Sequence, residues 1–276
     1  MAVPLAWMER REFAHYTVKD WIDVSKLGVI GNIAYYWCLI ECIQNAGVPV
    51  AGMAMSAVPV LVAAVSNIRD KKKGTALAWS RLVPGLTLIV CGFALASMTE
   101  FEMVVQASAD GGLKFWYGVM MAVAALLIWT WYPIRNADWL LAHPDRSPRA
   151  RSTAQGLTTF PFAVVMYFFF WGLEPDATPL LGYDPAWFVF VMVFSGLMGS
   201  WVGIVFWNAM SQRLPTALAG QMIVFETIFA VTYAHVLRMQ WPEWNMLAGM
   251  ALLLSGVMLS LKVFQTAKAQ HRSESV

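Results

Sequence analysis

Long apolar stretches separated by short polar segments dominate the chain. Eight of these stretches reach the length of about 17 residues or more that a helix needs to cross the hydrocarbon core of a bilayer. They cover residues 27–45, 49–67, 82–98, 115–132, 157–173, 187–210, 217–237 and 245–261. The stretches are continuously apolar, whereas the strands of an outer-membrane barrel alternate. Because backbone polar groups in lipid are paired within the chain, the pattern predicts an all-α, polytopic membrane protein with eight spanning helices.

A short pattern occurs twice along these stretches. The first copy runs Trp37, Gly47-Val48-Pro49, an apolar run with Pro59, and the segment 84–92; the second runs Trp207, Arg213-Leu214-Pro215, an apolar run with Glu226, and the segment 248–256. Matching positions are offset by 164 to 170 residues. The pattern indicates an internal repeat, which predicts two related halves.

The distribution of basic residues sets the orientation of these helices. If the amino terminus is cytoplasmic, 17 of the 19 lysines and arginines fall in cytoplasmic segments, and only Lys114 and Arg238 fall outside. This asymmetry predicts that both termini are cytoplasmic. The turn at Pro49 then lies outside and the matching turn at Pro215 lies inside, so the repeat is inverted about an axis in the membrane plane. In secondary transporters with such repeats, the substrate site lies between the halves.

The composition agrees with a multi-pass protein of the inner (plasma) membrane. The chain is 59% hydrophobic and 13% charged, and its net charge of +2 averages two oppositely charged faces, so we expect no nucleic-acid partner. The first eleven residues lack the apolar core of a cleavable signal peptide. The cysteines Cys38, Cys42 and Cys91 fall within predicted helices, which favours packing roles, and we predict no metal site and no cofactor.

Two carboxylates within the predicted spans are the main candidates for chemistry, because ionisable groups in a bilayer are costly and tend to face a cavity or a partner. Glu41 shares a helix face with Cys38 and Asn45, and Glu226 lies nearer the middle of its helix. Each is a candidate for binding protons or a substrate amine. The alternative is a carboxyl group that is hydrogen-bonded between helices or, for Glu41, wetted from outside.

Other polar and aromatic side chains complete the candidate set. Asn208 and Gln221 are predicted to contact substrate, together with the deeply placed Trp37 and Trp207, although a helix–helix hydrogen bond is an alternative role for the amides. Gly199 and Gly203 form a spacing of small residues that predicts close helix packing.

The arrangement resembles the drug/metabolite transporter superfamily, in particular its ten-helix EamA-type exporters. The resemblance covers most of the chain and is most specific in Phe206-Trp207-Asn208-Ala209, in 215–219 and in 249–256. It implies two five-helix repeats packed with inverted topology around a central cavity, and export of small metabolites such as amino acids. Two departures stand out: Glu226 replaces a proline of that family, and two amino-terminal helices have no counterpart here.

The resemblance implies a division of the chain by sequence. Residues 1–132 correspond to a first repeat with three to four spans, 133–156 to a solvated cytoplasmic linker, 157–262 to the second repeat, and 263–276 to a cytoplasmic tail. Either the chain is truncated or its start lies upstream, or it is a carrier with eight spans.

The sequence therefore predicts a secondary transporter that exports a small metabolite by alternating access, with protons as a candidate coupling ion. The alternatives are a non-transporting membrane partner subunit, a truncated carrier, or an intramembrane enzyme. The motif HExxH is absent and no serine-protease pattern is complete, so the enzyme reading has the least support. Substrate identity, transport direction and oligomeric state stay open.

Overall fold

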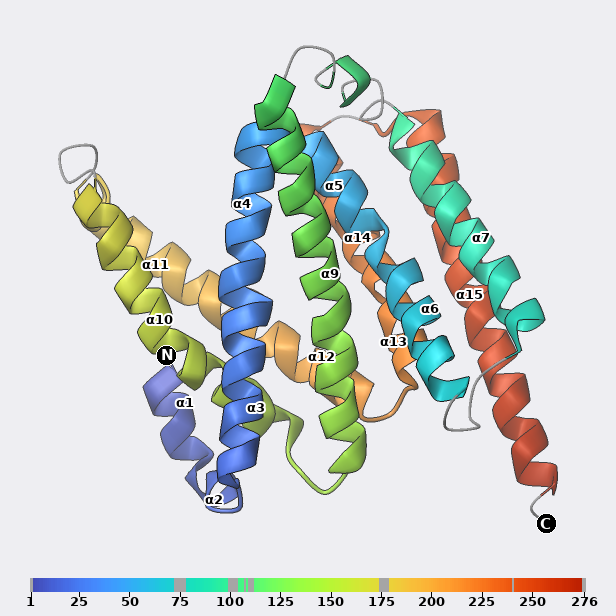
Figure 1. Cartoon of the computed structure of the whole chain (residues 1–276), viewed down its shortest axis with the longest axis horizontal. Helices are drawn as coiled ribbons and strands as arrows, with labels where there is room; N and C mark the ends of the chain where they lie inside the picture. The colour runs from blue at the N-terminus through green and yellow to red at the C-terminus, as the bar shows by residue number, and fades with distance from the viewer. Residues whose placement is uncertain are drawn as a thin grey trace. The chain divides into compact units, whose positions relative to one another are not determined.

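The structure is a computed structural model that describes residues 2–71, 78–98, 104–106, 108, 112–173, 179–239 and 241–274, and these are helical apart from turns and short connections (Figure 1). The helices are α1 (Ala2–Met8), α2 (Arg10–Phe13), α3 (Val18–Gly28), α4 (Tyr35–Ala46), α5 (Val48–Ser56), α6 (Val58–Lys71), α7 (Trp79–Ala96), α9 (Gly112–Ala142), α10 (Pro148–Leu173), α11 (Pro185–Phe194), α12 (Gly203–Ser211), α13 (Thr216–Gln221), α14 (Ile223–Arg238) and α15 (Trp244–Glu274). Two π-helical segments, η1 (Val29–Ala34) and η2 (Ser195–Val202), join α3 to α4 and α11 to α12.

Seven of the predicted spans are confirmed as helices that are long and apolar enough to cross a membrane. They run over Val18–Ala46, Val48–Asp70, Trp79–Ala96, Gly112–Ala142, Pro148–Leu173, Pro185–Ser211 and Trp244–Val263. The eighth, predicted at 217–237, corresponds to α13 and α14, where the apolar helix Thr216–Phe229 is shorter than the other seven. An eighth crossing therefore stays a prediction.

The chain forms two compact units, each assembled from two separate stretches. Unit 1 contains residues 1–36 and 135–214, and unit 2 contains 37–134 and 215–276. Each unit draws on both halves of the sequence. The sequence-based boundaries at 132, 156 and 262 divide the chain differently and stay a prediction.

The segment 133–156 is not the solvated linker that the sequence predicted. Helix α9 continues to Ala142 and α10 begins at Pro148, so only a short connection lies between them. Ala150 to Gln155 are all buried, with Arg151 at 0% exposure. The prediction was wrong because prolines and arginines were taken as signs of a solvated loop, whereas here they begin a helix whose first turns pack inside unit 1.

In unit 2, glycines bring α7 and α15 into backbone contact. A Cβ atom added to Gly92 would lie 2.8 Å from the carbonyl oxygen of Gly249, and one added to Gly249 would lie 2.7 Å from the carbonyl oxygen of Gly92. Gly85 and Gly256 make the same reciprocal contact one or two turns away. Small residues let helices approach this closely in a bilayer, where dispersion contacts replace the hydrophobic effect as the source of packing energy.

The glycines predicted to pack in the sixth span do not. No heavy atom lies within 4 Å of a Cβ built on Gly199, and a Cβ on Gly203 would meet only the carbonyl of Met198 at 4.0 Å. Both glycines lie at the π-helical segment η2 or directly after it. Spacing alone was misleading here, because a small-residue pair needs a facing helix to have an effect.

Two of the membrane helices are interrupted, and both interruptions fall in unit 2. Helix α5 ends at Ala57 (φ −78°, ψ −16°), and α13 ends at Met222 (φ −65°, ψ −17°). Each of these residues donates its N–H to the carbonyl three residues earlier, Ala54 at 3.2 Å and Met222's partner Ala219 at 3.1 Å. The two positions are 165 residues apart, within the offset of the sequence repeat.

The two interruptions have different local causes. Pro59 follows the first, and its missing N–H leaves a carbonyl on the preceding turn without the usual helical partner. The second has no proline between Thr216 and Arg238. All six residues of α13 are buried, and Gly220 allows α13 to approach Val62 of α6, whose Cβ would lie 2.7 Å from an added Cβ. Tertiary packing therefore stabilises the second interruption.

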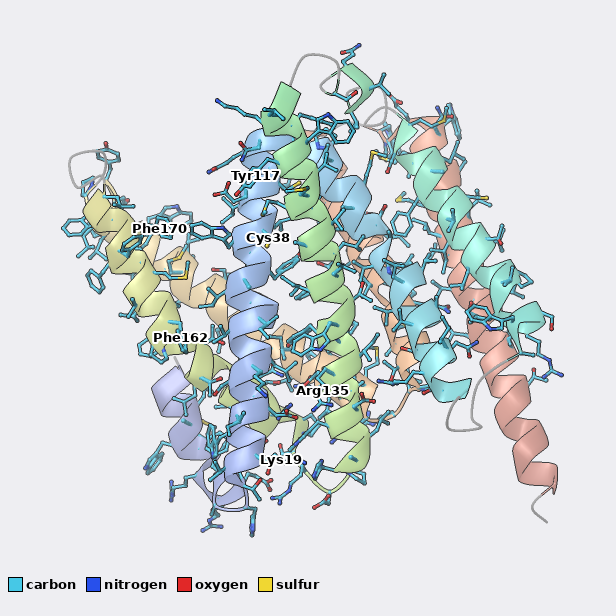
Figure 2. All side chains as sticks on the ribbon, in the orientation of Figure 1. Lys19, Cys38, Tyr117, Arg135, Phe162 and Phe170 are labelled. Carbon is cyan, nitrogen blue, oxygen red and sulfur yellow. The ribbon has the colours of Figure 1, made fainter. Side chains whose placement is uncertain are left out.

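The spans of α10 and of α11 to α12 present an aromatic surface. In each, none of the most apolar 18-residue window is buried within the molecule, against 22–33% for the other spanning helices. Phe162 and Phe170, labelled in Figure 2, are 48% and 44% exposed on α10. Such a surface is compatible with contact with lipid acyl chains.

We expect Gly249→Ala to destabilise unit 2, because the added methyl group would overlap the backbone of α7 and the side chain of Ala96. The free energy of unfolding in mixed detergent micelles should fall by roughly 1–3 kcal/mol. Gly52→Ala in α5 is the matched control, since no atom lies within 4 Å of its added Cβ. An equal effect of the two substitutions would contradict the close packing of α7 and α15.

Candidate functional site

The six predicted site residues fall in both units. Trp37, Glu41, Gln221 and Glu226 belong to unit 2, and Trp207 and Asn208 belong to unit 1. The structure joins Glu41 to a polar group on α4 and α9, and Asn208 to a network within unit 1. Each set is described within its own unit.

Glu41 lies half-buried on α4 and is hydrogen-bonded from two directions. The side-chain amide of Asn45 donates to the Glu41 carboxylate at 3.3 Å and to its backbone carbonyl at 2.8 Å, as expected for residues one turn apart. The hydroxyl of Tyr117 on α9 also hydrogen-bonds the Glu41 side chain. The backbone of α9 is held close to α4 because Gly118 faces Ala46, whose Cβ would lie 2.6 Å from an added Cβ. Tyr117 was not predicted, because its contact joins two helices.

Trp37 and Cys38 precede Glu41 on α4. Trp37 is 44% exposed, so it does not lie deep in unit 2 as predicted. Its exposure follows from the helical spacing, which places it on an outer part of α4. Cys38 is half-buried, while Cys42 is fully buried in an apolar cluster, in agreement with a packing role for Cys42.

Gln221 and Glu226 flank the interruption at Met222. Gln221 is 1% exposed, and its Oε1 has no hydrogen-bond partner among the described residues. Glu226 lies in the first turn of α14 with an exposed side chain, where the positive end of the helix dipole favours a carboxylate. The interruption thus combines a buried amide oxygen with a carboxylate one turn into the next helix.

Asn208 of α12 is fully buried at the centre of a polar network in unit 1. Its Oδ1 accepts a hydrogen bond from the Asn136 amide at 2.6 Å, and its own amide donates to the Ser152 hydroxyl at 2.9 Å. The Asn136 Oδ1 in turn accepts from the Gln155 amide at 3.0 Å. The network links α9, α10 and α12. Trp207, the next residue back, is half-buried, and its indole Nε1 has no hydrogen-bond partner in the described part of the chain.

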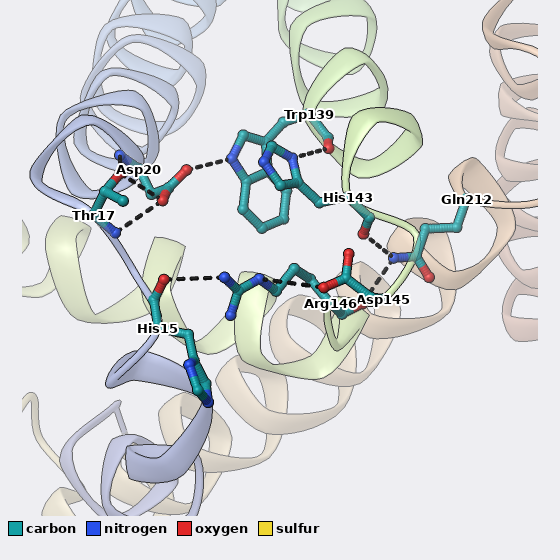
Figure 3. A network of polar contacts seen from close by, with 8 residues as sticks. All are labelled: His15, Thr17, Asp20, Trp139, His143, Asp145, Arg146 and Gln212. Carbon is teal, nitrogen blue, oxygen red and sulfur yellow. Dashed lines mark hydrogen bonds and ion pairs between the residues drawn. The ribbon is translucent and has the colours of Figure 1, made fainter.

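Trp139 of α9 anchors the amino-terminal segment to the connection between α9 and α10. Its indole Nε1 donates to Asp20 at 2.7 Å, and the His143 ring stacks on it with 4.5 Å between centroids (Figure 3). Arg146 donates to the His15 carbonyl at 3.0 Å, and Gln212 of α12 donates to the Arg146 carbonyl at 2.9 Å (Figure 3). The amino terminus is thus tied to both sides of this connection.

Arg151 was not among the predicted site residues. Its guanidinium carbon lies 4.1 Å from the centroid of the Trp139 ring, and its Nε donates to Asn136 Oδ1 at 3.4 Å. Tyr16 packs against Trp139 with 5.7 Å between ring centroids. Burial raises the pKa of Tyr16 to about 12, although the nearby charge of Arg151 acts to lower it. The Tyr16 hydroxyl is therefore protonated near neutral pH.

Within the described residues, no group of three or more histidine, cysteine, aspartate or glutamate side chains is arranged to hold a metal ion. The polar side chains above are amides, hydroxyls, one arginine and two carboxylates. Such groups recognise polar organic molecules through hydrogen bonds and charge.

The spanning helices and the buried polar side chains define a polytopic helical membrane protein. No protein-family model matches the chain. A relative, inner membrane protein YtfF of Escherichia coli (strain K12), is 34% identical over 266 residues, which are 95% of this chain and 82% of the relative. The chain belongs to the same family as inner membrane protein YtfF.

A protein of known crystal structure has a similar fold. The two superpose with a TM-score of 0.60 over 90% of this chain and 79% of the other, at 18% sequence identity. This likeness concerns the arrangement of the helices alone.

We expect the stability of unit 1 to depend on the ionisation of Tyr16. Between pH 10 and 12 the unfolded chain loses the Tyr16 proton while the folded chain keeps it, so the free energy of unfolding falls over this window. The contribution is fully present below pH 10 and amounts to about 2 kcal/mol. Measured unfolding in micelles across this range should show a smaller decline for Tyr16→Phe than for the unsubstituted protein; parallel declines would contradict the burial of this hydroxyl.

Proposed function

We propose that the chain is a secondary transporter of the drug/metabolite transporter superfamily, of the EamA type, which exports a small metabolite such as an amino acid or a related compound. In this proposal it lies in the inner membrane with both termini in the cytoplasm, works by alternating access, and uses protons as the coupling ion. It acts as a carrier and not as an enzyme, and it needs no cofactor.

The observation that carries the proposal is the pair of matched helix interruptions at Ala57 and Met222. Their separation of 165 residues falls within the offset of the sequence repeat, and their backbone angles are nearly the same. Transporters built from inverted repeats bind substrate at discontinuous helices, because the interruption frees backbone groups near the middle of the membrane. The unpartnered Oε1 of Gln221 places a further polar atom at one interruption.

The π-helical segments support the same reading of the repeat. Val29, the first residue of η1, and Ser195, the first residue of η2, are 166 residues apart. Single π-helical turns within α-helices occur often at functional sites. The helix before each interrupted helix thus carries a second matched irregularity.

The glycine contacts between α7 and α15 support a two-fold axis in the membrane plane. Gly85 corresponds to Gly249, and Gly92 to Gly256, at an offset of 164 residues in both cases. Exchanging corresponding residues converts the contact of Gly92 with Gly249 into the contact of Gly256 with Gly85, and both contacts are present. Equivalent helices of an inverted pair make such reciprocal contacts across their axis.

Glu226 and Glu41 are the proposed proton-binding groups. Tyr117 and Asn45 hold Glu41 in one orientation, and Glu226 follows the interruption at Met222 by one turn. Both carboxylates lie in predicted spans, where protonation removes the cost of a charge. Gln221, Asn208, Trp207 and Trp37 are the proposed substrate contacts.

Transport by the purified chain in proteoliposomes tests the proposal. Efflux and uptake of labelled amino acids and nucleobases would be measured with and without a proton gradient. We expect gradient-dependent transport of at least one compound, and a decrease of tenfold or more in Glu226→Gln, because the amide carries no titratable proton.

Glu243→Gln is the matched control, since it makes the same chemical change at an exposed carboxylate before α15. Its transport should equal that of the unsubstituted protein. Equal accumulation in vesicles with and without protein across the panel would contradict the carrier function for these compounds. Transport that is unchanged in Glu226→Gln would remove Glu226 from the proton-binding role.

A further inference from the structure

A fully buried guanidinium lies near the start of α10 in unit 1. Arg151 is 0% exposed, four residues into a helix of 26 residues that begins at Pro148. The ring of Trp139 covers the guanidinium at 4.1 Å, and Asn136 accepts from Nε at 3.4 Å. These contacts fix the plane of the guanidinium. A buried ionisable group at membrane depth or near it is costly and usually has a function.

The neighbouring amides are oriented around this cation. Asn136 turns its carbonyl oxygen toward Arg151 and Gln155, and its amide toward Asn208. Asn208 passes the same polarity on, because its oxygen faces Asn136 and its amide faces Ser152. Negative ends of the first dipole thus point at the guanidinium. The network stabilises a positive charge at this position without neutralising it.

Two hydroxyl groups of unit 1 are buried without a hydrogen-bond partner among the described residues. They are Tyr16 Oη and Ser211 Oγ. Tyr16 is close enough to Arg151 for the guanidinium charge to act on its ionisation. Ser211 is 1% exposed and lies one turn beyond Asn208 on α12. Buried hydroxyls are nearly always hydrogen-bonded, so two without partners indicate an absent group that would bind here.

The carboxylates of unit 1 have other partners. Asp20 accepts from Trp139 and from Thr17, Asp23 lies 3.4 Å from Arg135, and Glu9 is paired with Arg149. A carboxylate arriving from outside the chain would therefore add to these contacts and would displace none of them.

We propose that Arg151, Tyr16 and Ser211 form a recognition site for the carboxylate group of a small organic acid. This inference rests on the proposed carrier function and names its substrate class. The guanidinium supplies two parallel N–H donors that match the two oxygens of a carboxylate, and the hydroxyls supply further donors. The first turn of α10 adds the positive end of its helix dipole.

The chemistry favours a carboxylate over a phosphate. One guanidinium compensates the single charge of a carboxylate, whereas a phosphate carries up to two charges and is commonly held by several cationic groups. The planar carboxylate also fits beside a guanidinium that Trp139 holds flat. Because Arg151 has no exposed surface, the ligand enters only when the first turns of α10 separate from α9 and α12, as a transport cycle requires.

Ligand binding to the purified protein in detergent tests the site without requiring transport. The probes are L-phenylalanine, L-serine and pyruvate, each compared with the amide of the same acid. Binding would be measured by the shift in melting temperature and by the change in tryptophan fluorescence, since Trp139 lies against Arg151. We expect at least one acid to bind and its amide to bind at least tenfold more weakly.

The variants separate recognition from folding. Arg151→Lys should weaken binding of that acid tenfold or more, because an ammonium group lacks the parallel donors. Tyr16→Phe and Ser211→Ala are milder changes and should each weaken it about threefold to tenfold while the protein stays monodisperse. Arg149→Lys is the matched control, because Arg149 lies on the same helix turn but is paired with Glu9. It should bind as the unsubstituted protein does.

The outcomes distinguish this site from the carrier function. Failure of all three acids to bind, equal binding of acids and amides, or binding unaffected in Arg151→Lys, Tyr16→Phe and Ser211→Ala would each overturn the site, the hydroxyls then being filled by water. Transport of amines or nucleobases alongside such a failure would leave the carrier function standing. Arg151-dependent binding of an acid that is never transported would uphold the site and contradict the carrier function.

Discussion

Backbone N–H and C=O groups in the hydrocarbon of a bilayer have to find partners within the chain, and the rest of this structure depends on that constraint. It makes the apolar stretches helical and makes every interruption costly. At Ala57 and Met222 the chain limits the cost by forming hydrogen bonds to the third residue back. Packing of α13 against α6, through Gly220 and Val62, stabilises the interruption that has no proline. The irregular positions persist because their surroundings hold them.

Much of the helical architecture was predictable, because the length of an apolar stretch is a local property. Seven of the predicted spans are present, and the offset of the repeat anticipated where the two interruptions and the two π-helical segments correspond. The segment 133–156 was misread, because its arginines were counted as signs of a cytoplasmic loop. Whether an arginine is solvated or buried depends on the helices that surround it, and a single sequence does not state this. Gly199 and Gly203 failed for the same reason.

The candidate site was predictable only where its contacts are local. The pairing of Asn45 with Glu41 follows from residues one helical turn apart. Asn208 was identified as a buried amide, but its partners Asn136 and Ser152 come from other helices. Arg151 and Tyr117 act through contacts of the same kind. Their roles follow from the fold, which brings together residues that no short motif connects.

The glycine contact between α7 and α15 has a consequence for how the protein is made. Helix α15 is the last helix of the chain, so α7 enters the membrane long before its partner is synthesised. During that interval the flat glycine surface of α7 faces lipid or another helix, and α7 has no partner to fix its rotation. Assembly of unit 2 is therefore completed only after translation ends, and the insertion machinery must tolerate an incompletely packed helix until then.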